Sequence, residues 1–334
     1  MSQSEPMPPH LLSGTLFSLA AGLMWGLVFI GPLLLPEYPA ALQSFGRYLA
    51  FGLIALPLGW LDRVQLRTLR QSDWIEALKL SLVGNIVYYL CLASAIQRAG
   101  GPLPTMIIGT LPVVIAVVTQ LRTAGAGARV ETPVAWSRLL PSLLVIGLGI
   151  GLVNHVELER LRADPGADLT RYAQGGLLAV CAAACWTWYP IRNGEWLRAH
   201  PGRSPRAWAT AQGLATLPLA LGGYGLTWCW FTITSNPFPM PFGPRGADFV
   251  LLMFAIGIFA SWLGTLCWNE ASQRLSPALA GQLIVFETLA ALAYAFVLRR
   301  SMPPAEVLAG VALLVAGVVW AVRAQRGSAV KAGA

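Results

Sequence analysis

The sequence predicts an all-α membrane protein with ten transmembrane helices, arranged as two inverted repeats of five helices. Three observations support this fold class. Of the 334 residues, 56% are hydrophobic and only 11% are charged, whereas soluble domains carry roughly 25% charged residues. Ten hydrophobic runs follow one another between Leu11 and Val322, and a helix needs roughly 20 apolar residues to cross a bilayer. The last five runs also repeat the first five.

Each hydrophobic run is continuous and rich in Leu, Ala and Gly. A transmembrane barrel would instead show segments of about ten residues with alternating polarity, so we expect helices. No Lys or Arg precedes the first run, and no small-residue cleavage site follows it. This pattern argues against a secretory signal peptide. The predicted spans are 12–33, 38–60, 74–97, 103–121, 136–154, 172–191, 207–231, 248–270, 277–298 and 304–322.

The loops between these spans differ in charge. Fourteen Lys and Arg residues fall on one side of the ten-span arrangement and seven on the other, and the basic side faces the cytoplasm. We therefore expect a multi-pass protein of the bacterial inner (plasma) membrane with both termini cytoplasmic. Its predicted parts are a cytoplasmic tail, a first repeat, a periplasmic linker, a second repeat and a second cytoplasmic tail, at 1–10, 11–154, 155–171, 172–322 and 323–334.

The net charge of +8 does not indicate nucleic acid, because the basic residues are spread over separate loops rather than interleaved with aromatics. Contact with anionic lipid headgroups explains it. We expect a monomer that contacts a small-molecule substrate and membrane lipid.

The two halves match through an ordered series of offsets. A shift of 176 residues places Leu90–Arg98 on Leu266–Arg274 with five identities in nine positions. A shift of 161 pairs Trp25 with Trp186, and a shift of 168 pairs two glycines of spans five and ten. Because each half holds an odd number of spans, the second half must be inverted relative to the first. Inverted repeats are typical of alternating-access transporters, although a duplicated membrane scaffold is the simpler alternative.

The five-plus-five layout, the run Phe45-Gly46-Arg47-Tyr48 and the segment from Phe286 to Gly317 resemble the EamA-type transporters of the drug/metabolite transporter superfamily. The richness in Trp and Tyr is most similar to the aromatic amino acid exporter (YddG-type) branch. The resemblance implies an exporter of small amphipathic metabolites that works by alternating access around a central cavity. That family often has a Glu-Pro pair in spans four and nine, whereas this chain has Leu111-Pro112 and Glu287-Thr288.

Two ionisable residues, Arg47 and Glu287, lie deep within predicted spans. Charged groups at this depth are costly and normally face a partner or a water-filled pathway. Glu287 could bind a proton, hold an ammonium group of the substrate, or form a structural ion pair with Arg47. We predict that both residues act in gating or as an ion pair.

A second group of candidates consists of polar and aromatic residues within the spans. Asn85 and Tyr89 map onto Ser261 and Thr265 at the 176 shift, so two related spans offer hydrogen-bonding groups at equivalent depth. Hydrogen bonds between helices are the alternative explanation. Aromatic walls suit flat, apolar solutes and also organic cations. The candidate substrate-binding residues are Trp25, Asn85, Tyr88, Tyr89, Thr110, Trp186, Trp188, Ser261, Thr265, Gln282 and Phe286.

A membrane-embedded enzyme acting on a lipid or apolar substrate is the alternative from another functional class. The three histidines, His10, His155 and His200, are scattered, and no phosphate-binding Gly-Lys-Ser/Thr loop is present. We therefore expect no catalytic residues, no metal and no cofactor. The five cysteines all fall inside predicted spans, where we expect buried free thiols: Cys91, Cys181, Cys185, Cys229 and Cys267.

Overall fold

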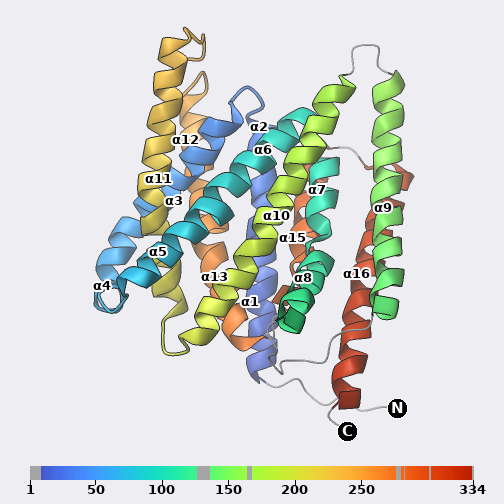
Figure 1. Ribbon diagram of the computed structural model, residues 1–334. Coiled ribbons are helices and arrows are strands. Elements are labelled where there is room, and N and C mark those ends of the chain that lie inside the picture. The colour runs from blue at the N-terminus through green and yellow to red at the C-terminus, as the bar shows by residue number, and fades with distance from the viewer. Residues whose placement is uncertain are drawn as a thin grey trace.

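A computed structural model describes residues 9–125, 136–163, 168–275, 280–281, 283–300 and 302–332. Every regular element in these residues is helical (Figure 1). The first half contains α1 (Pro9–Gly26), η1 (Leu27–Phe29), α2 (Gly31–Leu34), α3 (Ala40–Leu61), α4 (Arg63–Leu66), α5 (Gln71–Leu80), η2 (Ser81–Val87), α6 (Tyr88–Ala99), α7 (Pro102–Gly109), α8 (Leu111–Gly125) and α9 (Trp136–Ala163). The second half contains α10 (Leu169–Ala199), α11 (Pro205–Ile233), α12 (Gly246–Ile256), η3 (Gly257–Leu263), α13 (Gly264–Arg274), α15 (Val285–Arg299) and α16 (Ala305–Ala332).

The expectation of a helical membrane protein is confirmed. Within the described residues, five helical segments are long and apolar enough to cross a membrane, and they coincide with predicted spans one to four and eight: Leu12–Leu34, Ala40–Leu61, Gln71–Ala99, Pro102–Thr119 and Gly246–Arg274. The other predicted spans coincide with α9, α10, α11, α15 and α16, although α15 begins later than the predicted span. The count of ten spans stays a prediction.

Several spans are not continuous α-helices. The first narrows to a 3-10 turn at Leu27–Phe29 before α2 begins at Gly31, and the fourth is divided at Thr110. Pro32 and Pro112 follow these breaks, and proline has no N–H to continue the helical hydrogen-bond ladder. Both breaks therefore have a local cause in the sequence.

Spans three and eight each contain a π-helical segment, η2 at Ser81–Val87 and η3 at Gly257–Leu263. Both ends of the second segment lie 176 residues after those of the first (257 − 81 and 263 − 87), which is the offset found in the sequence. π-helical turns are rare and occur frequently at functional sites. The two halves thus share an unusual local backbone as well as a sequence offset.

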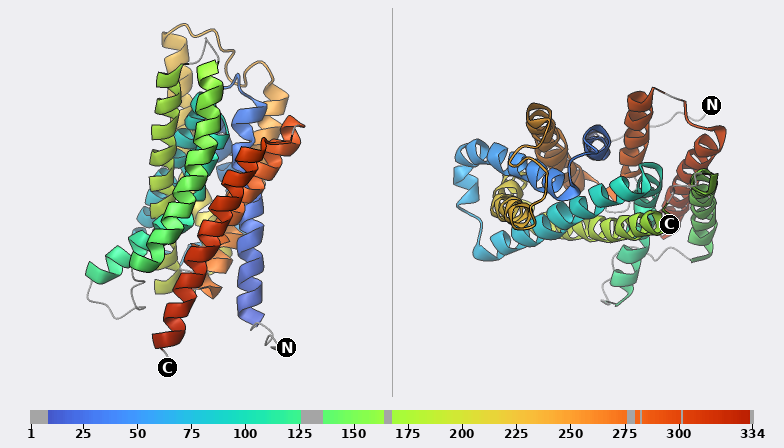
Figure 2. Two further views of the ribbon diagram at one scale, coloured as in Figure 1. Left: turned by 90° about the vertical axis from the view of Figure 1, so that its right-hand side faces the viewer. Right: turned by 90° about the horizontal axis from the view of Figure 1, so that it is seen from above.

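The helices pack in matching pairs. α1 runs along α13, and its counterpart in the second half, α10, runs along α6 (Figure 1). α3 packs on η3, and its counterpart α11 packs on η2. Other large contacts join α3 to α11, α9 to α16 and α1 to α15, and the pair of α9 and α16 lies at one side of the molecule in the right view of Figure 2.

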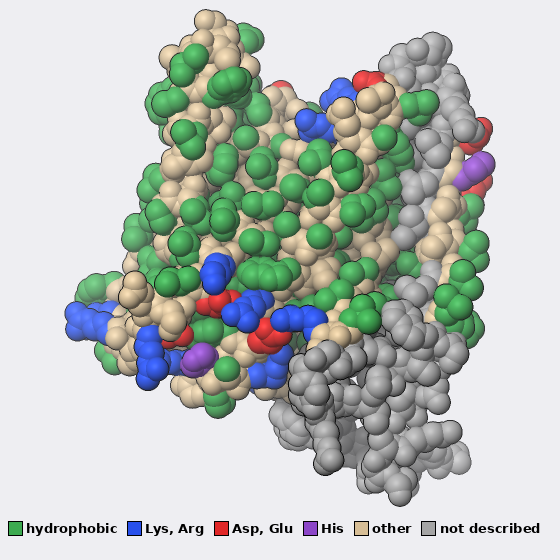
Figure 3. Space-filling view, viewed as in Figure 1, with side chains coloured by type: hydrophobic (Ala, Val, Ile, Leu, Met, Phe, Trp, Pro, Cys, Tyr) green, Lys and Arg blue, Asp and Glu red, His purple; other side chains and the backbone are tan. Residues whose placement is uncertain are grey.

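The outer surface is apolar around the middle of the molecule. Figure 3 shows hydrophobic side chains over most of one face, with Lys, Arg, Asp and Glu gathered mainly along its lower edge. α1 begins and α16 ends at this same end of the bundle (Figure 1). The cysteines are free thiols as expected, but the expectation that they are buried is wrong: Cys181 and Cys229 are exposed and the other three are half-buried. Cys181 and Cys229 lie on the outer surface of their helices, whereas Cys91, Cys185 and Cys267 pack against the core.

Candidate functional site

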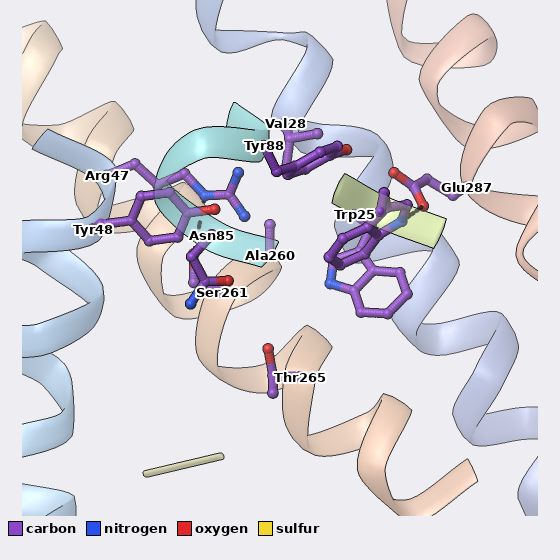
Figure 4. Close-up of a pocket in the computed structure, with 11 residues that line it drawn as sticks. Trp25, Val28, Arg47, Tyr48, Asn85, Tyr88, Ala260, Ser261, Thr265 and Glu287 are labelled. Carbon is purple, nitrogen blue, oxygen red and sulfur yellow. Dashed lines mark hydrogen bonds between the residues drawn. The ribbon is translucent and has the colours of Figure 1, made fainter. Parts of the chain in front are cut away.

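A narrow cavity lies between the two halves of the chain, and its free volume of about 10 Å³ corresponds to about one water molecule in this conformation. Its walls come from α1, η1, α3, η2, α6, α10, η3, α13 and α15, so residues far apart in sequence converge there (Figure 4). The lining residues are Trp25, Val28, Arg47, Tyr48, Asn85, Tyr88, Trp186, Ala260, Ser261, Thr265 and Glu287.

One wall of the cavity is built on an aromatic stack, in which Tyr88 and Trp186 line the cavity and Tyr189 does not. The ring of Trp186 lies parallel to Tyr88 on one side, with centroids 4.7 Å apart, and to Tyr189 on the other, 4.9 Å apart. Trp25 meets Trp186 edge-on at 5.0 Å. Such offset-stacked and edge-to-face contacts stabilise aromatic clusters. Because Tyr88 and Tyr189 cover both faces of Trp186, this ring presents an edge, and the cavity can contact an apolar group through the rings of Trp25, Tyr88 and Trp186.

Arg47 reaches the cavity from α3 and is only 4% exposed. Its Nε donates to the hydroxyl of Ser261 over 3.0 Å. Its guanidinium lies over the rings of Tyr48 and Tyr89, 4.8 and 4.5 Å from their centroids, an arrangement that stabilises a cation. The buried Nη1 atom has no hydrogen-bond partner. The side chain is thus held in place but retains an unused donor.

Glu287 lies on α15 and is fully buried. One carboxylate oxygen, Oε2, accepts a hydrogen bond from the indole nitrogen of Trp186 over 3.3 Å. The other oxygen, Oε1, has no partner, and neither does the hydroxyl of Tyr88, which points toward Glu287 (Figure 4). Among the ion pairs of the described residues, none joins Glu287 to Arg47.

The two π-helical segments place polar groups at the cavity. Asn85 in η2 donates to the hydroxyl of Thr216 over 3.1 Å, and Ser261 in η3 binds Arg47. The neighbouring glycines allow close packing: a Cβ added at Gly84 would lie 2.2 Å from the Tyr189 ring, and one at Gly264 would lie 2.7 Å from Nε1 of Trp25.

Comparisons with known proteins identify the family. The model of the EamA-like transporter family matches residues 12–123. The inner membrane protein YtfF of Escherichia coli K12 is 53% identical over 315 residues, which cover 94% of this chain and 96% of that protein. The chain belongs to the EamA-like transporter family. A solved crystal structure of another protein matches this transporter with a TM-score of 0.64 at 18% identity, covering 94% of the transporter and 99% of the other chain, which supports the helical fold alone.

In this EamA-like transporter, the cavity brings together many of the residues singled out in the sequence: Trp25, Arg47, Asn85, Tyr88, Trp186, Ser261, Thr265 and Glu287. Tyr89 lies behind the cavity wall, where its hydroxyl donates to the carbonyl of Val28 over 3.1 Å. Thr110, Trp188 and Phe286 are half-buried but do not line the cavity. Gln282 lies outside the described residues.

Sequence reasoning missed Tyr48, Val28 and Ala260 as lining residues of the transporter. Tyr48 directly follows Arg47 and could have been included on that ground. Ala260 lies at the 176 offset from Gly84, so the repeat also carried a signal for it. No group of three or more possible metal ligands occurs within the described part of the chain.

Proposed function

We propose that this protein exports small amphipathic metabolites across the bacterial inner membrane, with aromatic amino acids as its best-matched substrates. The observation that carries the proposal is the stack of Tyr88, Trp186 and Tyr189 beside Trp25 at the cavity. Flat aromatic walls bind aromatic solutes through ring contacts, and the hydroxyl and amide groups of η2 and η3 supply polar contacts. The relative in E. coli is an inner membrane protein, in agreement with this location.

We infer that transport occurs by alternating access between two inverted five-helix repeats at 11–154 and 172–322. The matched π-helical segments support this inference, because they occupy equivalent positions in spans three and eight. The packing of the helices is reciprocal as well. α1 packs on α13, and α10, the counterpart of α1, packs on α6, the counterpart of α13. In such transporters, the two repeats rock about a fixed central site.

In this proposal, two polar clusters close the path on either side of the cavity. In the inner cluster, Asn193 accepts from Trp208 over 2.8 Å and from Gln212 over 3.1 Å, and its own amide donates to Asn269 over 2.9 Å. All four side chains are buried. These bonds join α10, α11 and α13, and opening toward the cytoplasm would separate these helices.

In the outer cluster, the ring of Tyr38 stacks on Phe249 with centroids 4.8 Å apart. Its hydroxyl donates to the carbonyl of Phe242 over 2.9 Å and accepts from the backbone N–H of Arg245 over 2.8 Å. The loop before α3 is thereby joined to the chain before α12. Opening toward the periplasm would break these contacts.

The orientation rests on the loop charges, which place both termini in the cytoplasm and the 155–171 linker in the periplasm. α1 begins and α16 ends at the same end of the bundle (Figure 1), as expected for a chain that crosses the membrane an even number of times.

Purified protein in liposomes tests the proposal. A panel of radiolabelled solutes should include aromatic amino acids, aliphatic amino acids and an organic cation, with and without a proton gradient. We expect the fastest flux for the aromatic amino acids. Conversion of a substrate into a product would favour the membrane-enzyme alternative. Flux of the organic cation alone would mean that the protein transports organic cations and not aromatic amino acids.

A further inference from the structure

The part of the chain that the structure describes places two buried side chains of opposite formal charge, Arg47 and Glu287, in the cavity, and they form no direct ion pair with each other. Arg47 enters from α3 and Glu287 from α15, and they lie on opposite sides of Tyr88 in Figure 4. Each side chain has one atom bound to the protein, through Ser261 and Trp186 respectively. Each also has one buried atom, Nη1 of Arg47 and Oε1 of Glu287, that has no partner.

An ionised group buried without a partner is strongly disfavoured, and within a membrane such groups normally face a partner or a transport path. A ligand with only an anionic group would bind Arg47 and leave the buried carboxylate of Glu287 with neutral donors alone, the indole of Trp186 and the nearby hydroxyl of Tyr88. A ligand with only a cationic group would likewise leave Arg47 without a charged partner. One ligand that carries both charges satisfies both side chains and leaves the occupied site without net charge.

We propose that the cavity recognises a zwitterion, whose anionic group binds Nη1 of Arg47 and whose ammonium group binds Oε1 of Glu287. The apolar body of the ligand lies against the rings of Trp25, Tyr88 and Trp186. This inference rests on the proposed transport function and deepens it, because it assigns the two charged groups of the substrate to two named residues.

The surroundings of the two residues support this assignment. Arg47 is fixed by Ser261 and by the rings of Tyr48 and Tyr89, so its unpartnered nitrogen is already oriented when the ligand arrives. Glu287 is fixed by Trp186, which is itself stacked between two tyrosines. Preorganised groups lose little freedom on binding, which favours affinity.

Binding of three indole ligands to the purified protein tests the assignment: tryptophan carries both charges, tryptamine lacks the carboxylate and indole-3-propionate lacks the ammonium group. We expect the unmutated protein to bind tryptophan at least about tenfold more tightly than either analogue. Arg47→Gln should abolish the preference over tryptamine and keep the preference over indole-3-propionate. Glu287→Gln should show the reverse pattern.

Ser261→Ala is a second variant that leaves both charges in place. Because it removes only the hydroxyl that holds Arg47, it should weaken the discrimination against tryptamine alone. Arg98→Gln and Glu306→Gln are matched controls, since both residues are exposed and lie away from the cavity, and they should bind all three ligands as the unmutated protein does. Thermal melting of each variant verifies that it is folded.

A parallel set of leucine, isopentylamine and 4-methylpentanoate separates this inference from the proposed function. The same charge discrimination in the aliphatic set, without binding of the indoles, would overturn the aromatic substrate class and leave the zwitterion assignment standing. Equal binding of all three indoles, or a Glu287→Gln variant with unchanged preferences, would overturn the assignment while aromatic transport could still hold. Binding of neither set would overturn both.

Discussion

The indole nitrogen of Trp186 donates a hydrogen bond to Oε2 of Glu287 across 3.3 Å, although the two residues are 101 positions apart in the sequence. This contact joins α10 to α15 at the cavity. In this conformation Glu287 therefore has a neutral partner. The sequence left open a role in gating, in binding or as an ion pair with Arg47, and among the described residues the structure shows no direct ion pair between these two in this conformation. The carboxylate remains available to a ligand on its other oxygen.

Replacement of Glu287 by glutamine should impair transport more than it impairs folding. Glutamine keeps the size of the side chain and an oxygen that can accept from Trp186, so the packing of α15 should be retained. It removes the negative charge that a gating or binding role requires. Liposome flux and melting temperature, measured over a range of pH, test this. Flux equal to that of the unmutated protein, with the same pH dependence, would reject a role for the carboxylate.

Trp186→Phe should lower the affinity for substrate while leaving the protein folded. Phenylalanine can still stack between Tyr88 and Tyr189 but cannot donate to Glu287. A hydrogen bond to a charged group contributes about 1.5 kcal/mol or more to stability. Because this bond is present before the ligand arrives, its loss should lower the melting temperature, and the affinity should fall because the carboxylate is no longer held toward the ligand. Trp188→Phe is the matched control, because Trp188 is half-buried and does not line the cavity. An equal loss in both variants would mean that general packing, and not the bond to Glu287, causes the effect.

Gly84→Ala should destabilise the protein. The new Cβ would lie 2.2 Å from a ring carbon of Tyr189, and the ring is fixed on its other face by Trp186. Overpacking of this kind costs about 1–3 kcal/mol, which should appear as a lower melting temperature in detergent. Gly222→Ala is the control, since nothing lies within 4 Å of its added Cβ. An unchanged melting temperature for Gly84→Ala would show that α10 can move away from η2.

Thr265→Val should reduce substrate affinity, whereas Thr110→Val should not. Thr265 lines the cavity, and valine keeps its shape without the hydroxyl. Thr110 lies at the break between α7 and α8, where its hydroxyl donates to the carbonyl of Ile107 over 2.7 Å. Binding measurements on both variants check this pair. A loss of binding in Thr110→Val with normal folding would restore Thr110 to the site.

Reporter fusions test the orientation. A reporter that is active only in the cytoplasm should work at the carboxyl terminus and fail within the 155–171 linker. The opposite result would invert the arrangement and contradict the assignment from loop charge.

Much of the helical architecture follows directly from composition and run length, because a bilayer imposes a minimum length on every helix that crosses it. The breaks at Pro32 and Pro112 also have a signal in the sequence. The π-helical segments do not, because η2 and η3 depend on close packing against Tyr189 and Trp25 from other helices. The secondary-structure propensities of the residues in a segment carry no information about such contacts with other helices.

The residues of the cavity could be predicted where the repeat constrained them. Asn85 and Ser261 occupy the equivalent segments η2 and η3, and both line the cavity. The partners of Arg47 and Glu287 could not be predicted, because the sequence shows only that two charges lie deep in the membrane. Which polar group meets each charge depends on the rotation of whole helices, and this is decided by packing across the bundle.

The π-helical segments also change which mutations matter. A π-helical turn holds about one residue more than an α-helical turn, and an α-helix turns by about 100° per residue, so restoring an ordinary α-helix in η2 without deleting a residue would rotate α6 by about that angle relative to α5. Tyr88 would then leave the cavity, although the span would keep its length, its hydropathy and nearly all of its residues. Substitutions that restore ordinary α-helical hydrogen bonding in η2 or η3 should therefore inactivate the protein, whereas deleting one residue from the same turn should offset the rotation, and related chains should keep the extra residue in both turns.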